Sequence, residues 1–138
     1  SDVQMIIQPG YGLVELVESG DFSSGQVLEL LHRYIDPMIE AGADHLVLGC
    51  THYPFLEEAI ENVTQGKLTI VNPAPAVALQ VQRMYEKLPD RSPEPISYQF
   101  YTSGSSATLR MLVHQIVTRK RLENAIKFNY ICYPLNDY

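Results

Sequence analysis

Apolar residues recur along the chain at two spacings, one typical of helices and one typical of strands. Between Gly25 and Ala41 they return every three or four positions, which predicts an amphipathic helix capped by Ser23 or Ser24 and stopped by Gly42. The same spacing predicts helices at residues 54–63, 76–88 and 108–119, and a loop or short helix at residues 13–18. Short apolar runs predict strands at residues 3–7, 44–48, 68–71, 98–102 and 125–133.

The order of these segments determines the expected fold class. Strands and helices alternate, and this favours a Rossmann-like α/β fold in which a mostly parallel sheet is flanked by helices. Pro89, Pro93 and Pro95 stand among charged residues and interrupt the pattern. The chain is therefore expected to divide into residues 1–88 and residues 96–138.

Composition narrows the classes of protein to consider. The chain has 138 residues, of which 46% are hydrophobic, enough for a compact core of ordinary domain size. A net charge of −6 argues against a nucleic-acid partner or an anionic membrane, because both need clustered Lys and Arg. The sequence has two cysteines and no recognisable secretory signal or long apolar span. A disulfide framework is therefore not expected, and the reducing cytoplasm is the expected location.

The stretch Leu48–Pro54 carries the candidate chemistry. Cys50 follows a predicted strand and precedes a predicted helix, so it should lie at the carboxyl end of a parallel strand, where α/β proteins bind ligands. A helix N-terminus and a histidine two residues away, His52, both favour a thiolate. Such a thiolate could attack a carbonyl, bind a metal or take a proton from carbon. Cys50 could equally be a buried structural thiol, as Cys132 is expected to be.

The residues Leu-Gly-Cys-Thr-His-Tyr-Pro at 48–54 resemble the second catalytic-cysteine signature of bacterial glutamate racemases. Two further segments, at residues 16–20 and 100–104, are similar to the Leu-Val-Glu and Phe-x-x-Thr-Gly stretches of that family. The resemblance implies an aspartate/glutamate racemase-like fold. It also implies cofactor-independent interconversion of L- and D-glutamate, which supplies D-glutamate for peptidoglycan.

The same resemblance assigns roles to individual residues. The family uses two cysteines, one as a thiolate base and one as a thiol acid on opposite faces of the substrate, and Cys50 matches the second. His52 would assist Cys50, Thr51 would help to bind the substrate, and Glu18 would belong to the surroundings of the reacting centre. Without the resemblance, Glu18 is interpreted as an exposed acid near a turn. No cofactor and no metal are implied.

Several segments of the family have no counterpart in this chain. A Cys-Asn-Thr segment with the first catalytic cysteine, an early Asp-Ser motif and a Pro-Tyr-Gly segment are all missing, and residues 10–12 do not replace the last of these. The simplest interpretation is the carboxyl-terminal portion of a longer racemase, inactive alone, with the missing amino-terminal half as its partner. Residues 1–88 would then belong to the second lobe, and residues 96–138 would return to the first. A homodimer stays open.

Three other functions are compatible with parts of this sequence. Aspartate racemases share the fold but tend to have Thr-Glu after the cysteine, so Thr51 followed by His52 favours glutamate. A Cys-His hydrolase would use Cys50 as a nucleophile and would need an oriented base and an oxyanion hole. A non-catalytic module would leave Cys50 inert and buried.

Overall fold

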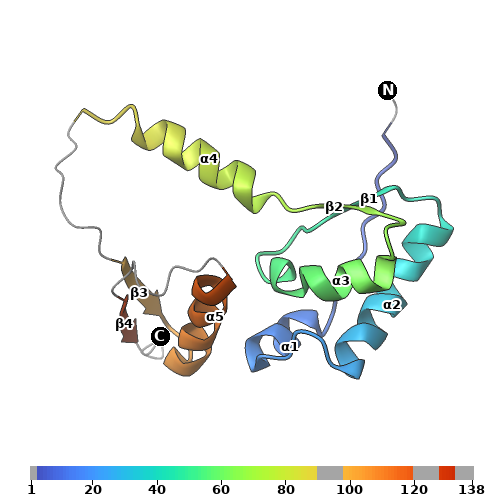
Figure 1. The fold of residues 1–138 in the computed structure, drawn as a ribbon, viewed down its shortest axis with the longest axis horizontal. Helices are drawn as coiled ribbons and strands as arrows, with labels where there is room; N and C mark the ends of the chain where they lie inside the picture. The colour runs from blue at the N-terminus through green and yellow to red at the C-terminus, as the bar shows by residue number, and fades with distance from the viewer. Residues whose placement is uncertain (1–2, 90–97, 120–127, 133–138) are drawn as a thin grey trace, which may run out of the picture. The chain divides into compact units, whose positions relative to one another are not determined.

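A computed structural model of the chain describes residues 3–89, 98–119 and 128–132, and describes no side chain from residue 119 onward. Its contacts divide the chain into two compact units, Ser1–Pro89 and Asp90–Tyr138. Figure 1 labels the elements of both units. The assignment of the two predicted parts to two lobes of a longer protein stays a prediction.

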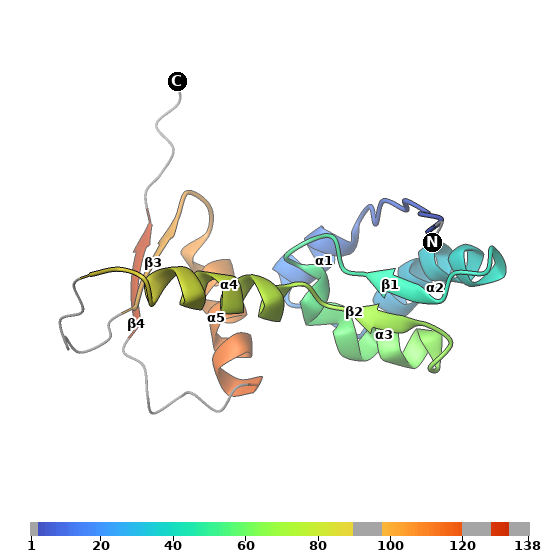
Figure 2. The same cartoon turned by 90° about the horizontal axis from the view of Figure 1, so that it is seen from above.

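The first unit contains one pair of parallel strands with helices beside it. The strands are β1 (His45–Val47) and β2 (Thr69–Val71), and Leu46 lies opposite Ile70. The helices are α1 (Leu13–Ser19), α2 (Gly25–Glu40), η1 (Tyr53–Leu56, a 3₁₀-helix), α3 (Glu57–Thr64) and α4 (Ala74–Tyr85). Helices α2 and α3 pack against each other, and the two views agree on this (Figures 1 and 2). The predicted α/β class with parallel strands is confirmed.

The ends of α2 follow the local sequence. The Ser24 hydroxyl accepts the Val27 N–H at 3.3 Å, so Ser24 is the cap. After the helix, Gly42 has a φ of 86°, a left-handed conformation that glycine adopts without a steric penalty, and its N–H donates to the Ile39 carbonyl at 2.9 Å. Pro37 lies inside the helix. The predicted cap and stop are therefore both confirmed.

The core of the first unit is an apolar cluster between α1, α2 and the η1–α3 segment. Its members are buried aliphatic side chains: Leu13, Val17, Val27, Leu31, Ile35, Leu48, Leu56, Ala59, Ile60, Val63 and Leu68. The stripe of α2 that the sequence predicted as core is thus buried, at Val27, Leu31 and Ile35. Leu56 is fully buried, so η1 is anchored in this core immediately after the Cys50 turn.

Two expectations for the first unit need correction. Residues 3–7 form no strand, and the side chains of Val3, Met5 and Ile7 are largely exposed. A strand needs a neighbour for its backbone hydrogen bonds, and among the described residues β1 is paired only with β2. The helix expected from residue 54 also begins differently, because Pro54 lies in η1 and the α-helix starts at Glu57.

The second unit is a strand, a helix and a parallel strand. β3 (Tyr98–Thr102) pairs with β4 (Phe128–Cys132), and Phe100 lies opposite Tyr130. Between them lies α5 (Ser106–Arg119), whose Val113 and Val117 are buried. Residues 125–127 and 133 of the predicted last strand, and the side chain of Cys132, lie outside the described residues. The strand–helix–strand order predicted here is confirmed.

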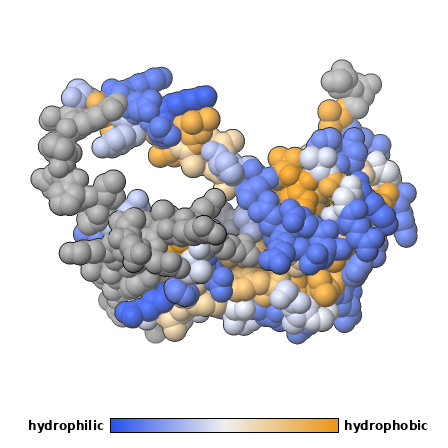
Figure 3. Space-filling model, in the orientation of Figure 1, coloured by the Kyte–Doolittle hydropathy of each residue, from blue (hydrophilic) through white to orange (hydrophobic). Residues whose placement is uncertain are grey.

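Helix α4 carries an apolar face that is exposed to solvent. It contains no buried residue, and its large apolar side chains are exposed at Val77, Leu79, Val81 and Met84. Figure 3 shows this apolar surface in orange along the helix. In the part of the chain that the structure describes, no helix is both long and apolar enough to cross a membrane. The predicted helix is confirmed, but no described residue buries its apolar side chains.

Replacing Leu56 by Ala should destabilise the first unit by about 3 kcal/mol, since the variant leaves a cavity in a closed core. Leu79 in α4 is 47% exposed, and Leu79→Ala is the matched control, with an expected change below about 0.5 kcal/mol. Urea unfolding followed by circular dichroism measures both values. Equal losses for the two variants would contradict the assignment of η1 to the core.

Replacing Asp21 by Asn should make the fold less sensitive to acid. The Asp21 carboxylate accepts the N–H groups of Ser24 at 3.0 Å and Ser23 at 3.4 Å, and hydrogen bonding to Ser24 lowers the pKa of this carboxyl below its ordinary 3.8. Because the folded-state pKa lies below the unfolded-state pKa, the stabilisation is present above the unfolded-state pKa. It is lost as the pH falls through the folded-state pKa.

Urea titrations at about pH 6 and about pH 3 test this expectation. The wild-type chain should lose more free energy of unfolding between the two pH values than Asp21→Asn does. An equal loss in both proteins would show that Asp21 contributes nothing to the acid sensitivity.

Candidate active site

Cys50 lies just beyond the carboxyl end of β1, as the sequence predicted. The backbone continues the strand pairing for one more residue, because the Leu48 N–H donates to the Val71 carbonyl at 3.0 Å. The chain then turns at Gly49 and Cys50, and the Tyr53 N–H donates to the Cys50 carbonyl at 3.2 Å. Since Leu48 and Leu56 are buried on either side, the turn is fixed at both ends, and Cys50 between them is half-buried.

The structure brings Cys50, His52 and Glu18 into one line. The Cys50 Sγ lies 3.7 Å from His52 Nδ1, and His52 Nε2 lies 3.2 Å from Glu18 Oε1. Glu18 is 34 residues away in the sequence, and α1 carries it to the site. The His52 side chain is 25% exposed and that of Glu18 is 53% exposed, so the line runs from the half-buried thiol outward to solvent.

This line can stabilise a thiolate. A protonated His52 would donate one N–H toward the sulfur and the other to the Glu18 carboxylate, because the two ring nitrogens face different partners. The Glu18 carboxylate can hold the ring in place, and the ring nitrogen that faces the sulfur can donate a hydrogen bond to it. The arrangement can therefore supply a base or a nucleophile at Cys50.

Two other expectations concern Thr51 and metal binding. Thr51 is exposed between Cys50 and His52, and its role in substrate binding stays a prediction. Within the described ranges, no group of three or more His, Cys, Asp or Glu side chains is arranged to hold a metal ion.

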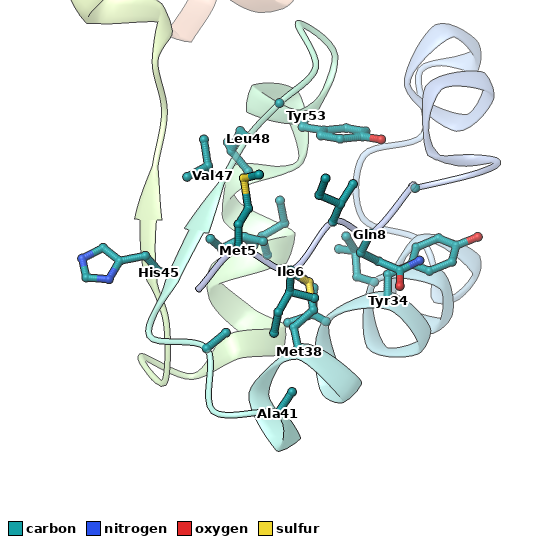
Figure 4. Close-up of a pocket in the computed structure, with 18 of the residues that line it drawn as sticks. Met5, Ile6, Gln8, Tyr34, Met38, Ala41, His45, Val47, Leu48 and Tyr53 are labelled. Carbon is teal, nitrogen blue, oxygen red and sulfur yellow. The ribbon is translucent and has the colours of Figure 1, made fainter. Parts of the chain in front are cut away.

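An apolar pocket of about 1010 Å³ lies beside the Cys50 turn. Its walls come from α2, from β1 and from residues 3–8, and Cys50 also lines it. Figure 4 shows Tyr53 among the lining side chains. Figure 4 shows Met5, Ile6 and Met38 among its apolar side chains, whereas the ring of His45 points away. No described lining residue is Lys or Arg, so the described lining offers no permanently charged cation to hold a carboxylate.

Tyr53 received no role of its own from the sequence. Its hydroxyl lies against Gly10, close enough that a Cβ at residue 10 would be 2.7 Å from the phenol oxygen. Burial raises the pKa of the Tyr53 phenol and the neighbouring Cys50 adds to the rise, while the Gly10 backbone opposes it. No sequence signal joins residues 10 and 53, because their contact depends on the packing of α1 beside η1.

Curated relatives match this chain over most of its length. It is 55% identical over 82 residues to a glutamate racemase of Ralstonia nicotianae, an alignment that covers 59% of this chain and 30% of the relative. It is 40% identical over 114 residues to a glutamate racemase of Pseudomonas putida, covering 82% of this chain and 43% of the relative. The chain thus spans less than half the length of these relatives. No family model matches it.

Solved structures of glutamate racemases have a similar fold. Glutamate racemase isoform RacE1 from Bacillus anthracis matches with a TM-score of 0.63 at 25% identity, over 89% of this chain and 44% of that one. The enzyme from Francisella tularensis, solved with D-glutamate, matches with a TM-score of 0.67 over 95% of this chain and 47% of that one. Its identity is only 22%, so this second likeness shows the fold alone.

Replacing His52 by Gln should slow the alkylation of Cys50 by iodoacetamide at neutral pH by roughly tenfold, because the thiolate loses its cationic neighbour. Mass spectrometry of the peptide that contains Cys50 gives the rate for this thiol alone. His32→Gln is the matched control, since His32 faces Asp36 at 3.1 Å within α2. Equal alkylation rates in the wild type and in His52→Gln would contradict the assignment of His52 as a partner of Cys50.

Sequence similarity and fold lead to the same group of enzymes. The relatives that are 55% and 40% identical are named glutamate racemase, and solved glutamate racemases match the fold with TM-scores of 0.63 and 0.67. The resemblance indicated by residues 48–54 and the racemase-like fold are confirmed. The chain is homologous to part of the glutamate racemases and has their fold.

Proposed function

We propose that this chain is the carboxyl-terminal, Cys50-bearing portion of a glutamate racemase that interconverts L- and D-glutamate without a cofactor. The observation that carries the proposal is the line Cys50–His52–Glu18 at the carboxyl end of β1, in a chain homologous to glutamate racemases. Its product, D-glutamate, would serve peptidoglycan synthesis in the cytoplasm.

The reaction explains why a reactive thiol is required. Glutamate has no electron sink of its own, so a base must take the α-proton on one face while an acid returns a proton on the other. In the proposed mechanism the Cys50 thiolate takes the proton from one enantiomer and becomes a thiol. A second cysteine thiol, on the missing amino-terminal half, gives its proton to the opposite face and becomes a thiolate. The roles exchange in the reverse direction.

The other site residues support Cys50 in this proposal. A protonated His52 stabilises the Cys50 thiolate, and Glu18 stabilises the protonated form of His52 through the contact at 3.2 Å. Thr51 is exposed next to the sulfur-bearing residue and is proposed to bind the substrate.

The remaining part of the active site is proposed to come from the rest of a longer protein. Glutamate carries two carboxylates and an ammonium group, whereas the pocket beside Cys50 is apolar and no described lining residue is Lys or Arg. The relatives are also more than twice as long as the matched segment. We therefore expect the chain alone to be inactive, and the missing amino-terminal half to be its partner. Sedimentation velocity would detect a homodimer of the chain as a concentration-dependent increase in sedimentation coefficient.

Cys50→Ser tests the proposal in the complete protein, this chain joined to its amino-terminal half. Racemisation should be abolished, because a serine hydroxyl is far too weak an acid to form a base near neutral pH. Elimination from a substrate analogue with a β-leaving group needs proton removal from one face only. The variant should therefore lose elimination for one enantiomer and keep it for the other.

Cys132→Ser is the control, because Cys132 has no proposed role, and it should racemise glutamate like the wild type. A folded Cys50→Ser protein that loses elimination for both enantiomers equally would contradict the two-thiol mechanism.

A Cys-His hydrolase is the second candidate, because a thiol, an imidazole and a carboxylate in line also activate a nucleophile. An activated ester would then leave an acyl group on Cys50, detectable by mass spectrometry. Absence of acylation, together with one-sided elimination by Cys50→Ser, would exclude this candidate.

A further inference from the structure

Two consecutive side chains of the Cys50 turn hold the two ends of α1. His52 reaches Glu18, near the carboxyl end of the helix, at 3.2 Å. Tyr53 reaches Gly10, whose carbonyl accepts the Leu13 N–H at 3.2 Å at the amino end. A seven-residue helix is about 10 Å long, so the two contacts lie well apart on one short rigid element.

The two contacts differ in strength. The pair between His52 and Glu18 is partly open to solvent, with Glu18 53% exposed, and a pair of this kind does not by itself fix the position of a helix. The contact of Tyr53 with Gly10 is a contact of packed atoms. A Cβ on residue 10 would be 2.7 Å from the phenol oxygen, 2.8 Å from Leu13 Cδ1 and 3.2 Å from the ring carbon that bears the oxygen. Only a residue without a side chain fits there unless both the Tyr53 ring and the end of the Leu13 side chain move.

We propose that Tyr53 is a positioning residue: its hydroxyl, seated against Gly10, sets the distance between α1 and the Cys50 turn and so keeps Glu18 in contact with His52. The inference rests on the proposed function in one respect, that the Cys50 thiolate is the reactive species. Tyr53 acts through α1 and Glu18, and it takes no proton in the reaction.

Gly10→Ala and Tyr53→Phe test this relation separately and together. Gly10→Ala places a methyl group against both the phenol oxygen and Leu13 Cδ1 of α1, and we expect α1 to move away from the turn in response. Tyr53→Phe removes that oxygen, and the double variant Gly10→Ala/Tyr53→Phe therefore relieves the collision at 2.7 Å while leaving the one with Leu13 Cδ1 at 2.8 Å. Gly25→Ala is the matched control, because a Cβ at Gly25 meets nothing within 4 Å.

The measurement is the rate of Cys50 alkylation by iodoacetamide between about pH 5 and about pH 9, on the chain itself. Glu18→Gln should move the profile to higher pH and slow alkylation at neutral pH at least about threefold, because His52 loses the carboxylate that favours its protonated form. Gly10→Ala should reproduce this shift, and adding Glu18→Gln to it should cause no further change. The double variant with Tyr53→Phe should return toward the wild-type profile, and Gly25→Ala should not depart from it.

Three results would overturn the inference. They are a folded Gly10→Ala protein with the wild-type profile, a double variant no better than Gly10→Ala, and a full Glu18→Gln effect in the Gly10→Ala background. Should Gly10→Ala fail to fold, Tyr53→Leu empties the same space without a collision, and it should shift the profile as Glu18→Gln does. A wild-type profile for Tyr53→Leu would equally overturn the inference.

Alkylation needs neither substrate nor the rest of a longer protein. A negative result would therefore remove the positioning role of Tyr53 and leave the racemase proposal standing. Conversely, a shifted profile in the chain, combined with a complete protein that racemises no glutamate, would support the positioning role and count against the proposed function.

Discussion

The parallel pairing of β1 with β2 is the constraint on which the candidate site depends. It holds Leu46 opposite Ile70 and extends by one hydrogen bond to Leu48, so the chain must leave the sheet at Gly49 and Cys50. Burial of Leu56 then fixes the other side of the turn in the core of the first unit. Backbone pairing and apolar packing hold residue 50 in this position. Neither interaction involves the Cys50 thiol, so the fold does not depend on it.

Electrostatics at the site are secondary to this packing. The His52–Glu18 contact is partly exposed, and an exposed pair contributes about 0–1 kcal/mol to stability, too little to bring α1 to the turn. Burial of Leu13 and Val17 supplies the larger driving force for docking α1. The carboxylate thus reaches the imidazole because the helix that carries it is packed there, and it can serve the chemistry of the thiol without also stabilising the fold.

In the proposed function, one explanation covers both the apolar surface that stays exposed and the parts of the active site that this chain does not supply. Val3, Met5 and Ile7 lie open beside the pocket, and α4 exposes its whole apolar face. Exposed apolar patches of this kind mark places where other protein surface packs. In the proposed function, the rest of a longer racemase supplies both the second thiol and the groups that recognise glutamate.

The sequence alone determined the features that depend on neighbouring residues. The helix from Gly25 with its Ser24 cap, the order of strands and helices, and the place of Cys50 after a strand follow from periodicity and side-chain chemistry within a few residues. Tertiary structure decided the contact of Glu18 with His52, the seat of Tyr53 on Gly10 and the unpaired state of residues 3–7. These features depend on segments that are far apart along the chain. The packing of α1 decides the contacts of Glu18 and Gly10, and the absence of a neighbouring strand among the described residues decides the state of residues 3–7.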